Sequence, residues 1–145
     1  MHLITEKMID SRLVTLNFKS LITGANNRRK LIVPENFSQD EIQKVLKKCL
    51  KNVEMISLKT EEPTLYYPYY PSSTISTSSK NSIDQYWKDG TLFFVNFFST
   101  KKERCYLIAV DDVFEKSSLE TLVTGYCMSH EEVTVSKWDD CWIKK

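Results

Sequence analysis

Residues 37–50, FSQDEIQKVLKKCL, carry the signals of an amphipathic helix around which the neighbouring segments are arranged. Apolar residues recur at intervals of three and four, with lysine and glutamine between them; they are Ile42, Val45, Leu46, Cys49 and Leu50. Ser38 followed by Glu41 is typical of a capping box, in which both side chains bond backbone N–H groups at the helix start. Phe37 precedes this cap and is expected to pack on Ile42. We therefore predict a helix with one buried face.

Alternating apolar residues on both sides of this helix predict strands. Residues 12–18 and 29–33 are expected to form a hairpin, because the Gly-Ala-Asn-Asn sequence at 24–27 suits a turn. Residues 53–59 resume the alternation after the helix and predict a third strand. These segments make up a first ββαβ unit, residues 12–59.

A second series of the same kind follows in residues 91–137. The predicted elements are strands at 91–99, 105–110 and 133–135, and a shorter helix that Ser117 and Glu120 cap and Gly125 ends. Residues 91–99 are apolar on both faces, which indicates either a central strand or an interface. Trp138 and Trp142 are assigned to a tail after the last strand.

The two units match at a constant spacing. A gapless shift of 77 residues aligns their apolar positions, among them Leu16 with Phe93, Leu31 with Ile108, Ile42 with Leu119 and Leu58 with Val135. Such similarity indicates duplication, although any two units of this type share periodicities. The predicted fold class is α+β, with antiparallel β-sheets, two helices and two pseudo-duplicated ββαβ units packed about a pseudo-twofold axis. The alternative is a ubiquitin-like roll built on the first unit, with extra strands from the second.

Residues 60–90 are expected to connect the two units within a single domain, residues 1–145. Proline and tyrosine dominate residues 61–71, whereas residues 72–82 are almost entirely serine, threonine and other polar residues. Such a run has too little apolar surface to offset its ordering entropy, so we expect a mobile loop at 72–82. The tyrosines before it either pack on a sheet or serve as anchors for a partner.

Length and composition restrict the class of protein. A chain of 145 residues can bury a core without a metal or a disulfide, and a net charge of +1 argues against a general phosphate-binding surface. The four cysteines lie in or beside apolar segments without CxxC spacing, which indicates buried thiols. The sequence has neither a signal peptide nor a membrane span, so we expect a cytoplasmic or nuclear location and no membrane contact.

Charge divides between the two units. Residues 12–59 carry ten Lys/Arg against four Asp/Glu, whereas residues 103–140 carry three against nine. A basic surface is expected from the first hairpin and the helix, made of Arg28, Arg29, Lys30, Lys44, Lys47, Lys48 and Lys51. Solvation explains most helix lysines; an acidic protein partner and RNA are the alternatives, and RNA binding would require interleaved aromatics that the pattern lacks. The acidic half suits a basic partner or the basic half of a second copy, as in a homo-oligomer.

Candidate catalytic groups are few. Cys127 and His130 stand three residues apart and Glu131 could orient the imidazole, but nucleophilic catalysis requires all three in contact. A zinc site of Cys127, His130 and Cys141 lacks close paired spacing. Asp111, Asp112 and Glu115 follow a strand, where acids usually serve solvation. We predict no catalytic residues, no metal and no cofactor.

Three features together predict the function: the lack of a catalytic set, the divided charge and the aromatic content. They predict a non-enzymatic protein-interaction domain, a small subunit or adaptor of a larger complex. The residues expected at the contact are Tyr66, Tyr67, Tyr69, Tyr70, Phe94, Phe98, Trp138 and Trp142. The alternative is a nucleic-acid-binding accessory factor that uses the basic first hairpin and helix.

Overall fold

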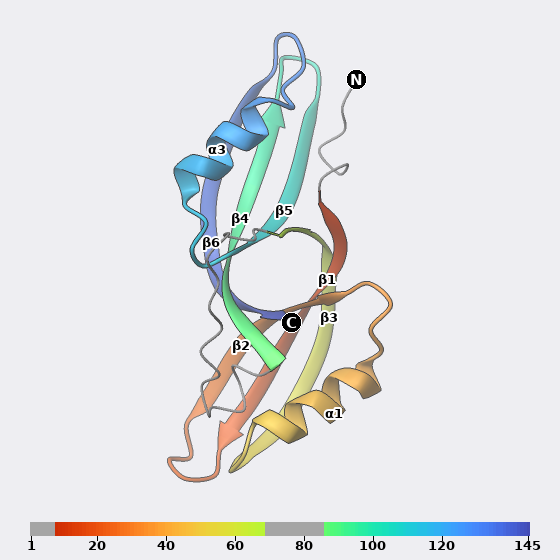
Figure 1. Ribbon diagram of the computed structural model, residues 1–145, viewed down its shortest axis with the longest axis vertical. Helices are drawn as coiled ribbons and strands as arrows, with labels where there is room; N and C mark the ends of the chain where they lie inside the picture. The colour runs from red at the N-terminus through yellow and green to blue at the C-terminus, as the bar shows by residue number, and fades with distance from the viewer. Residues whose placement is uncertain (1–7, 69–85) are drawn as a thin grey trace.

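A computed structural model describes residues 8–68 and 86–145, in which six strands form a closed ring between two helices (Figure 1). The elements are β1 (Ile9–Ser20), β2 (Asn26–Pro34), α1 (Gln39–Cys49), β3 (Val53–Tyr67), β4 (Trp87–Phe98), β5 (Glu103–Asp111), α3 (Lys116–Thr124) and β6 (Glu132–Lys144). The mobile loop expected at 72–82 lies outside the described residues.

The strands close into a barrel in the order β1-β2-β6-β4-β5-β3. Each half of the chain supplies a three-stranded antiparallel sheet, and two parallel contacts join the halves. Leu31 pairs with Trp142 between β2 and β6, and Leu65 pairs with Ile108 between β3 and β5. The prediction of an α+β fold with open antiparallel sheets is therefore wrong, and so is the ubiquitin-like alternative. Alternation identifies the faces of a strand but carries no information on which strand edges meet.

The order of strands around the ring is the same when β1, β2 and β3 are exchanged with β4, β5 and β6, respectively. The registers give the spacing: Val14 pairs with Leu31 in the first hairpin, and Phe93 pairs with Ile108 in the second. Ile108 follows Leu31 by 77 residues, but Phe93 follows Val14 by 79. The structural counterpart of Phe93 is thus Val14, and the predicted match with Leu16 is wrong. A displacement of two residues keeps every side chain on the same face, so the apolar pattern could not reveal it.

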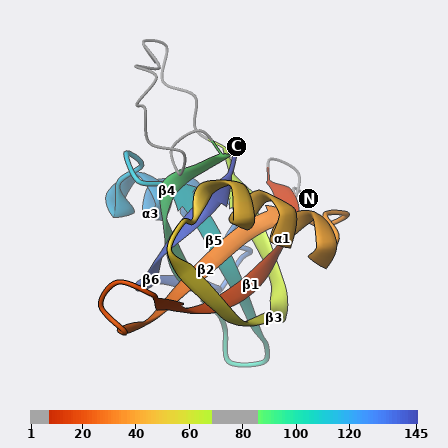
Figure 2. The same ribbon diagram turned by 90° about the horizontal axis from the view of Figure 1, so that it is seen from below.

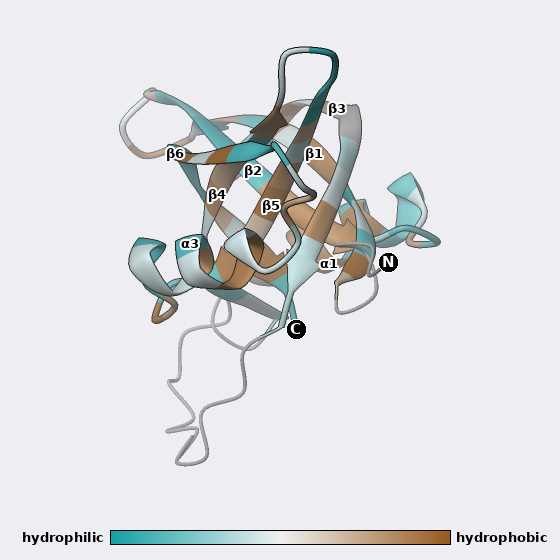
Figure 3. Ribbon diagram, turned by 90° about the horizontal axis from the view of Figure 1, so that it is seen from above, coloured by the Kyte–Doolittle hydropathy of each residue, from teal (hydrophilic) through white to brown (hydrophobic). Residues whose placement is uncertain are grey.

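Apolar side chains fill three layers. The barrel interior is lined by positions that correspond between the halves, including Leu13 with Leu92, Ile32 with Ala109 and Tyr66 with Ile143. α1 covers the outer face of the β2-β1-β3 sheet through Ile42 and Leu46, and α3 covers that of the β5-β4-β6 sheet through Leu119 and Val123 (Figure 2). Hydrophobic residues accordingly run along the strands that form the ring (Figure 3). Each helix therefore completes a core on its own unit.

The start of α1 follows its sequence signals, except that the Glu41 carboxylate bonds the Ser38 hydroxyl instead of a backbone N–H. The Ser38 hydroxyl accepts a hydrogen bond of 3.1 Å from the Glu41 backbone N–H and donates one of 3.1 Å to the Glu41 carboxylate. Phe37 packs against the cluster that contains Ile42, as expected. The helix prediction is confirmed.

Several predicted boundaries are wrong. β3 continues to Tyr67 through residues assigned to the connection, and β6 continues to Lys144, so Trp138 and Trp142 lie in a strand. The N-cap of α3 is Glu115, with no side-chain cap bond, and Ser117 lies inside the helix. Strand pairing within the barrel extends both strands beyond their alternating segments, because a partner ladder satisfies backbone groups whatever the side chains are.

Candidate functional site

Two exposed aromatic rings form the aromatic pair, Phe94 of β4 and Trp138 of β6. Their centroids lie 4.9 Å apart with an interplanar angle of 41°, and they are 37% and 39% exposed. Because neighbouring Phe93 and Val95 point to the α3 core, Phe94 points to the opposite, inner face of the β5-β4-β6 sheet, the face from which Leu92 enters the barrel interior. The aromatic pair therefore offers exposed apolar surface on the inner face of the sheet, next to the residues that fill the barrel interior.

A β-bulge places Trp138 on this face. The β4–β6 register passes from Leu92 opposite Asp139 directly to Phe93 opposite Lys137, which leaves Trp138 as the extra residue. Bulges of this kind redirect a side chain and increase local twist. The backbone irregularity thus brings the indole beside Phe94.

A lysine from the other unit contacts the aromatic pair. Lys30 of β2 is only 6% exposed, and its Nζ lies 4.2 Å from the centroid of the Trp138 ring. Among the ion pairs of the described residues, none includes Lys30. The ammonium is therefore stabilised by the ring quadrupole, and the indole is held in place by a residue outside its own sheet.

An apolar groove opens where β3 and β5 separate. Its volume is about 540 Å³, and it is lined by Asp10, Ser11, Glu35, Pro63, Thr64, Leu65, Phe94, Cys105, Tyr106 and Leu107. Leu65 and Ile108 are the first paired residues of the parallel contact, so the groove lies just before the strands join. Phe94 belongs both to this groove and to the aromatic pair.

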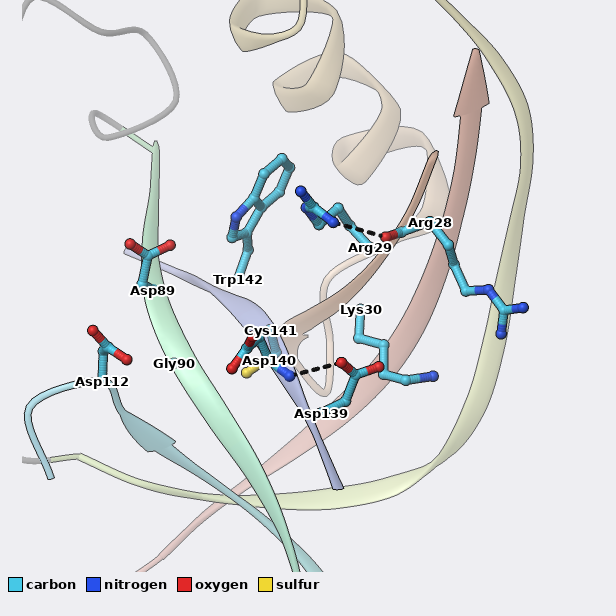
Figure 4. A pocket seen from close by; sticks show the side chains of 10 residues that line it. All are labelled: Arg28, Arg29, Lys30, Asp89, Gly90, Asp112, Asp139, Asp140, Cys141 and Trp142. Atoms are coloured by element: carbon cyan, nitrogen blue, oxygen red, sulfur yellow. Dashed lines mark hydrogen bonds between the residues drawn. The ribbon is translucent and has the colours of Figure 1, made fainter. Parts of the chain in front are cut away.

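A charged groove occupies the equivalent place between β2 and β6 (Figure 4). It has a volume of about 380 Å³ and is lined by Arg28, Arg29, Lys30, Asp89, Gly90, Asp112, Asp139, Asp140, Cys141 and Trp142. Its residues correspond to those of the apolar groove at the spacing of the two halves, so that Lys30 stands where the other groove has Leu107, and Trp142 where it has Leu65. The two grooves share one backbone design and differ in chemistry.

The structure separates most of the aromatic residues that the sequence assigned to a contact. Tyr66 is buried in the barrel and Tyr67 packs on Phe114 at 5.2 Å between centroids. Phe98 is half-buried at the end of β4. Trp142 is half-buried against the α1 core. Phe94 and Trp138 alone are brought together with substantial exposure, while Tyr69 and Tyr70 lie outside the described residues.

The basic residues of the first unit are distributed over both sheet faces. Arg29 lies over the Trp142 ring at 5.6 Å, on the side of the sheet that α1 covers, whereas neighbouring Lys30 lies over Trp138. Arg28 is exposed. The helix lysines Lys44, Lys47, Lys48 and Lys51 are also exposed. The pleat of β2 therefore divides the three consecutive basic residues that the sequence suggested as one surface.

The thiol and imidazole candidates lie in the turn between α3 and β6. Burial raises the pKa of the half-buried Cys127 thiol above its ordinary value of 9.0, and the Glu131 carboxylate adds to this shift. Glu131 instead accepts hydrogen bonds of 3.2 and 2.8 Å from Arg104 and one of 2.8 Å from the Met128 N–H. A raised pKa disfavours the thiolate that nucleophilic catalysis requires.

The described residues contain no group of three His, Cys, Asp or Glu side chains that could hold a metal ion. Asp111, which the sequence offered as a ligand beside Asp112, accepts a hydrogen bond from Tyr66 and pairs with Lys88. Its carboxylate therefore belongs to the barrel structure.

Sequence reasoning missed both grooves and the role of Lys30. A signal was present in the sequence. Lys30 and Ile32 share the strand face opposite Leu31 and Val33, which was expected to be exposed to solvent, yet Ile32 is apolar. An apolar residue on both faces of β2 indicates a second core, which barrel closure provides in this structure.

Comparison with protein-family models, with curated proteins and with solved structures finds no match to this chain. None of the described helices is long and apolar enough to cross a membrane.

Proposed function

We propose that this chain is a non-enzymatic protein-interaction domain that binds its partner through the exposed part of the inner face of the β5-β4-β6 sheet, at Phe94 and Trp138. The aromatic pair carries this proposal, since Phe94 and Trp138 are in contact and are exposed at the same place. Tryptophan and other large aromatics dominate the binding energy of protein interfaces. By contrast, Trp87 is fully buried and serves the core.

Preorganisation of Trp138 supports the same proposal. The indole is held between Phe94 on one strand and the Lys30 ammonium from the other unit. A side chain that is already ordered loses little conformational entropy when a partner binds. The aromatic pair thus has the rigidity expected of an anchor.

Nucleic-acid binding has weaker support. The exposed lysines of α1 lie in the first unit, whereas the aromatic pair lies in the second, next to several carboxylates of β6. Single-stranded nucleic acids are bound by aromatic platforms within a basic groove. Arg29 and Lys30 do lie over aromatic rings, but four aspartates line the groove that holds them, which opposes the binding of a phosphate backbone.

The test is affinity purification of the tagged chain from its native cells at low and high salt, followed by measurement of affinity with the purified partner. We expect a partner that is retained at high salt and lost by the Phe94→Ala/Trp138→Ala variant. The matched control is Leu21→Ala/Ile22→Ala, which removes exposed apolar side chains from the first hairpin, where these residues are 64% and 78% exposed. Partner affinity unchanged by the aromatic variant, or affinity abolished by nuclease treatment, would contradict the proposal.

A further inference from the structure

We propose that the apolar groove binds an extended segment of a protein partner in which basic residues alternate with small apolar residues, and that this segment is added to the sheet beside β5. This inference rests on the proposed function, since it names the chemistry of the partner. It is carried by three observations: an unpaired strand edge, an apolar floor and an acidic rim.

The edge of β5 that faces β3 is unpaired along half of its length. β5 pairs with β4 over residues 103–111, but with β3 only at residues 108–110. Within the described part of the chain, no strand pairs with the other edge of residues 103–107. Backbone N–H and C=O groups on such an edge form a ready template for a further strand.

The floor of the groove is apolar. On the inner face of the sheet this floor consists of Phe94 and of Leu107, which is buried in the barrel interior, whereas Leu65 lines the groove from the α3 core on the other face. Every second side chain of an added strand points to the same side, so alternate residues of a bound segment would contact this floor. Pockets of this size commonly hold apolar groups of a ligand.

The rim of the groove is acidic, and none of the described residues that line it is basic. Asp10 and Glu35 are both exposed there, and neither forms an ion pair with another described residue. Carboxylates at the edge of an apolar groove favour basic side chains on the residues between the apolar ones. Charge complementarity therefore selects a lysine- or arginine-bearing segment.

The charged groove provides an internal comparison. Arg28, Arg29 and Lys30 stand at the positions of Cys105, Tyr106 and Leu107, and aspartates face them from β4 and β6. These opposite charges lie between the corresponding strands, and Lys30 replaces the Leu107 of the apolar floor. The two halves thus differ in such a way that only the apolar groove suits an apolar segment.

Cys105 makes the proposal directly testable, because this exposed thiol lines the apolar groove. The probe is a synthetic peptide of alternating lysine and valine, compared with a glutamate–valine peptide and with a lysine–valine peptide interrupted by proline, which cannot continue a ladder. Of the three peptides, we expect only the lysine–valine peptide to slow the alkylation of Cys105, in proportion to the fraction of the protein that has bound it. The rate of alkylation of Cys127 should not change. Asp10→Lys/Glu35→Lys should abolish this protection, whereas Asp112→Lys/Asp139→Lys, the matched control in the charged groove, should preserve it.

Several results would overturn the inference. The first is an unchanged rate of Cys105 alkylation with about 1 mM lysine–valine peptide, a concentration that exceeds the Kd of most specific complexes. The second is equal protection of Cys105 by the glutamate–valine peptide. The third is protection of Cys105 that persists in the Asp10→Lys/Glu35→Lys variant. The outcome is separable from that of the proposed function, because Trp138→Ala removes the aromatic pair without touching the groove lining. Loss of the partner in Trp138→Ala together with no peptide protection would leave the interaction domain standing and reject only the peptide groove.

Discussion

The hydroxyl of Tyr66 in β3 donates a hydrogen bond of 2.8 Å to the Oδ1 atom of Asp111 at the end of β5. The same oxygen lies 2.9 Å from the Nζ atom of Lys88 in β4. These three residues connect three neighbouring strands and both halves of the chain, close to the parallel β3–β5 contact. Because Asp111 is buried, its charge must be compensated by such partners.

Tyr66→Phe should therefore destabilise the barrel. The change leaves the ring in place and removes one hydrogen bond to a charged group, so we expect a loss of about 1–3 kcal/mol in the free energy of unfolding. The measurement is urea denaturation at neutral pH. Tyr67→Phe is the matched control, since the Tyr67 ring packs on Phe114 and its hydroxyl has no hydrogen bond to another described residue. Equal effects of the two variants would show that the Tyr66–Asp111 bond contributes no net stability.

Gly90 lies where the Ile143 side chain and the Val110 carbonyl group approach the backbone closely. A Cβ atom at this position would overlap Cδ1 of Ile143 and lie 2.8 Å from the Val110 carbonyl oxygen. Gly90→Ala should cost about 1–3 kcal/mol of stability by overpacking. Gly125→Ala, whose nearest contact would be 3.4 Å from the Leu122 oxygen at a helical φ of −64°, should cost little or stabilise. Thermal denaturation of both variants decides this, and an unaffected Gly90→Ala protein would refute the close packing.

The Arg104–Glu131 pair makes stability depend on pH. Hydrogen bonds from the Arg104 guanidinium, and then from the Met128 N–H, hold the pKa of Glu131 below its ordinary value of 4.5. The group therefore contributes its full stability above pH 4.5 and loses it as the pH falls through the lowered folded-state pKa. Glu131→Gln should be less stable than the parent at neutral pH, and this difference should shrink below pH 4.5.

Glu132→Gln is the control for this experiment, because Glu132 is an exposed neighbour with no ion pair among the described residues. Chemical denaturation measured from pH 3 to pH 7 separates the two. A constant difference between the parent and Glu131→Gln across this range would mean that the pair is not coupled to folding.

The four thiols should differ widely in reactivity. Cys105 is exposed and should be alkylated first at pH 8. Burial raises the pKa of Cys127, so this thiol should react more slowly. Cys49 and Cys141 are buried, with pKa values that burial also raises, and should react only when the protein unfolds. Mass spectrometry of a time course gives the order, and a Cys127 that reacts faster than Cys105 would revive the thiol-enzyme alternative.

Neither half of the chain should fold alone. Leu13 and Ile32 of the first half pack with Leu92 and Ala109 of the second inside the barrel, and both parallel contacts cross between halves. A separated half would expose this interior and leave the edges of two strands unpaired. We expect fragments 1–76 and 77–145 to be largely unfolded by circular dichroism and to recover strand signal when mixed. A fragment that folds cooperatively by itself would show that barrel closure is dispensable.

Prediction from the sequence succeeded where the signal is local. The cap at Ser38 and the apolar spacing of Ile42 and Leu46 fixed α1, because these interactions lie within one helical turn. Prediction failed at the ends of β3 and β6, where pairing with another strand, and not alternation, sustains the ladder. The candidate site was predicted in part: Phe94 and Trp138 were named among eight aromatic residues, but nothing in the sequence distinguished them from the buried Tyr66.

The sequence by itself determined the elements and their faces, since helical and strand periodicities and caps arise from neighbours along the chain. Only the tertiary structure decided that the strand edges close into a barrel and that a bulge brings Trp138 beside Phe94. It also decided that, of two equivalent grooves, one is apolar and the other is charged. Each of these depends on contacts between segments separated by tens of residues. A period-two pattern cannot encode such pairing, because it is unchanged when a strand shifts by two residues or takes a different neighbour.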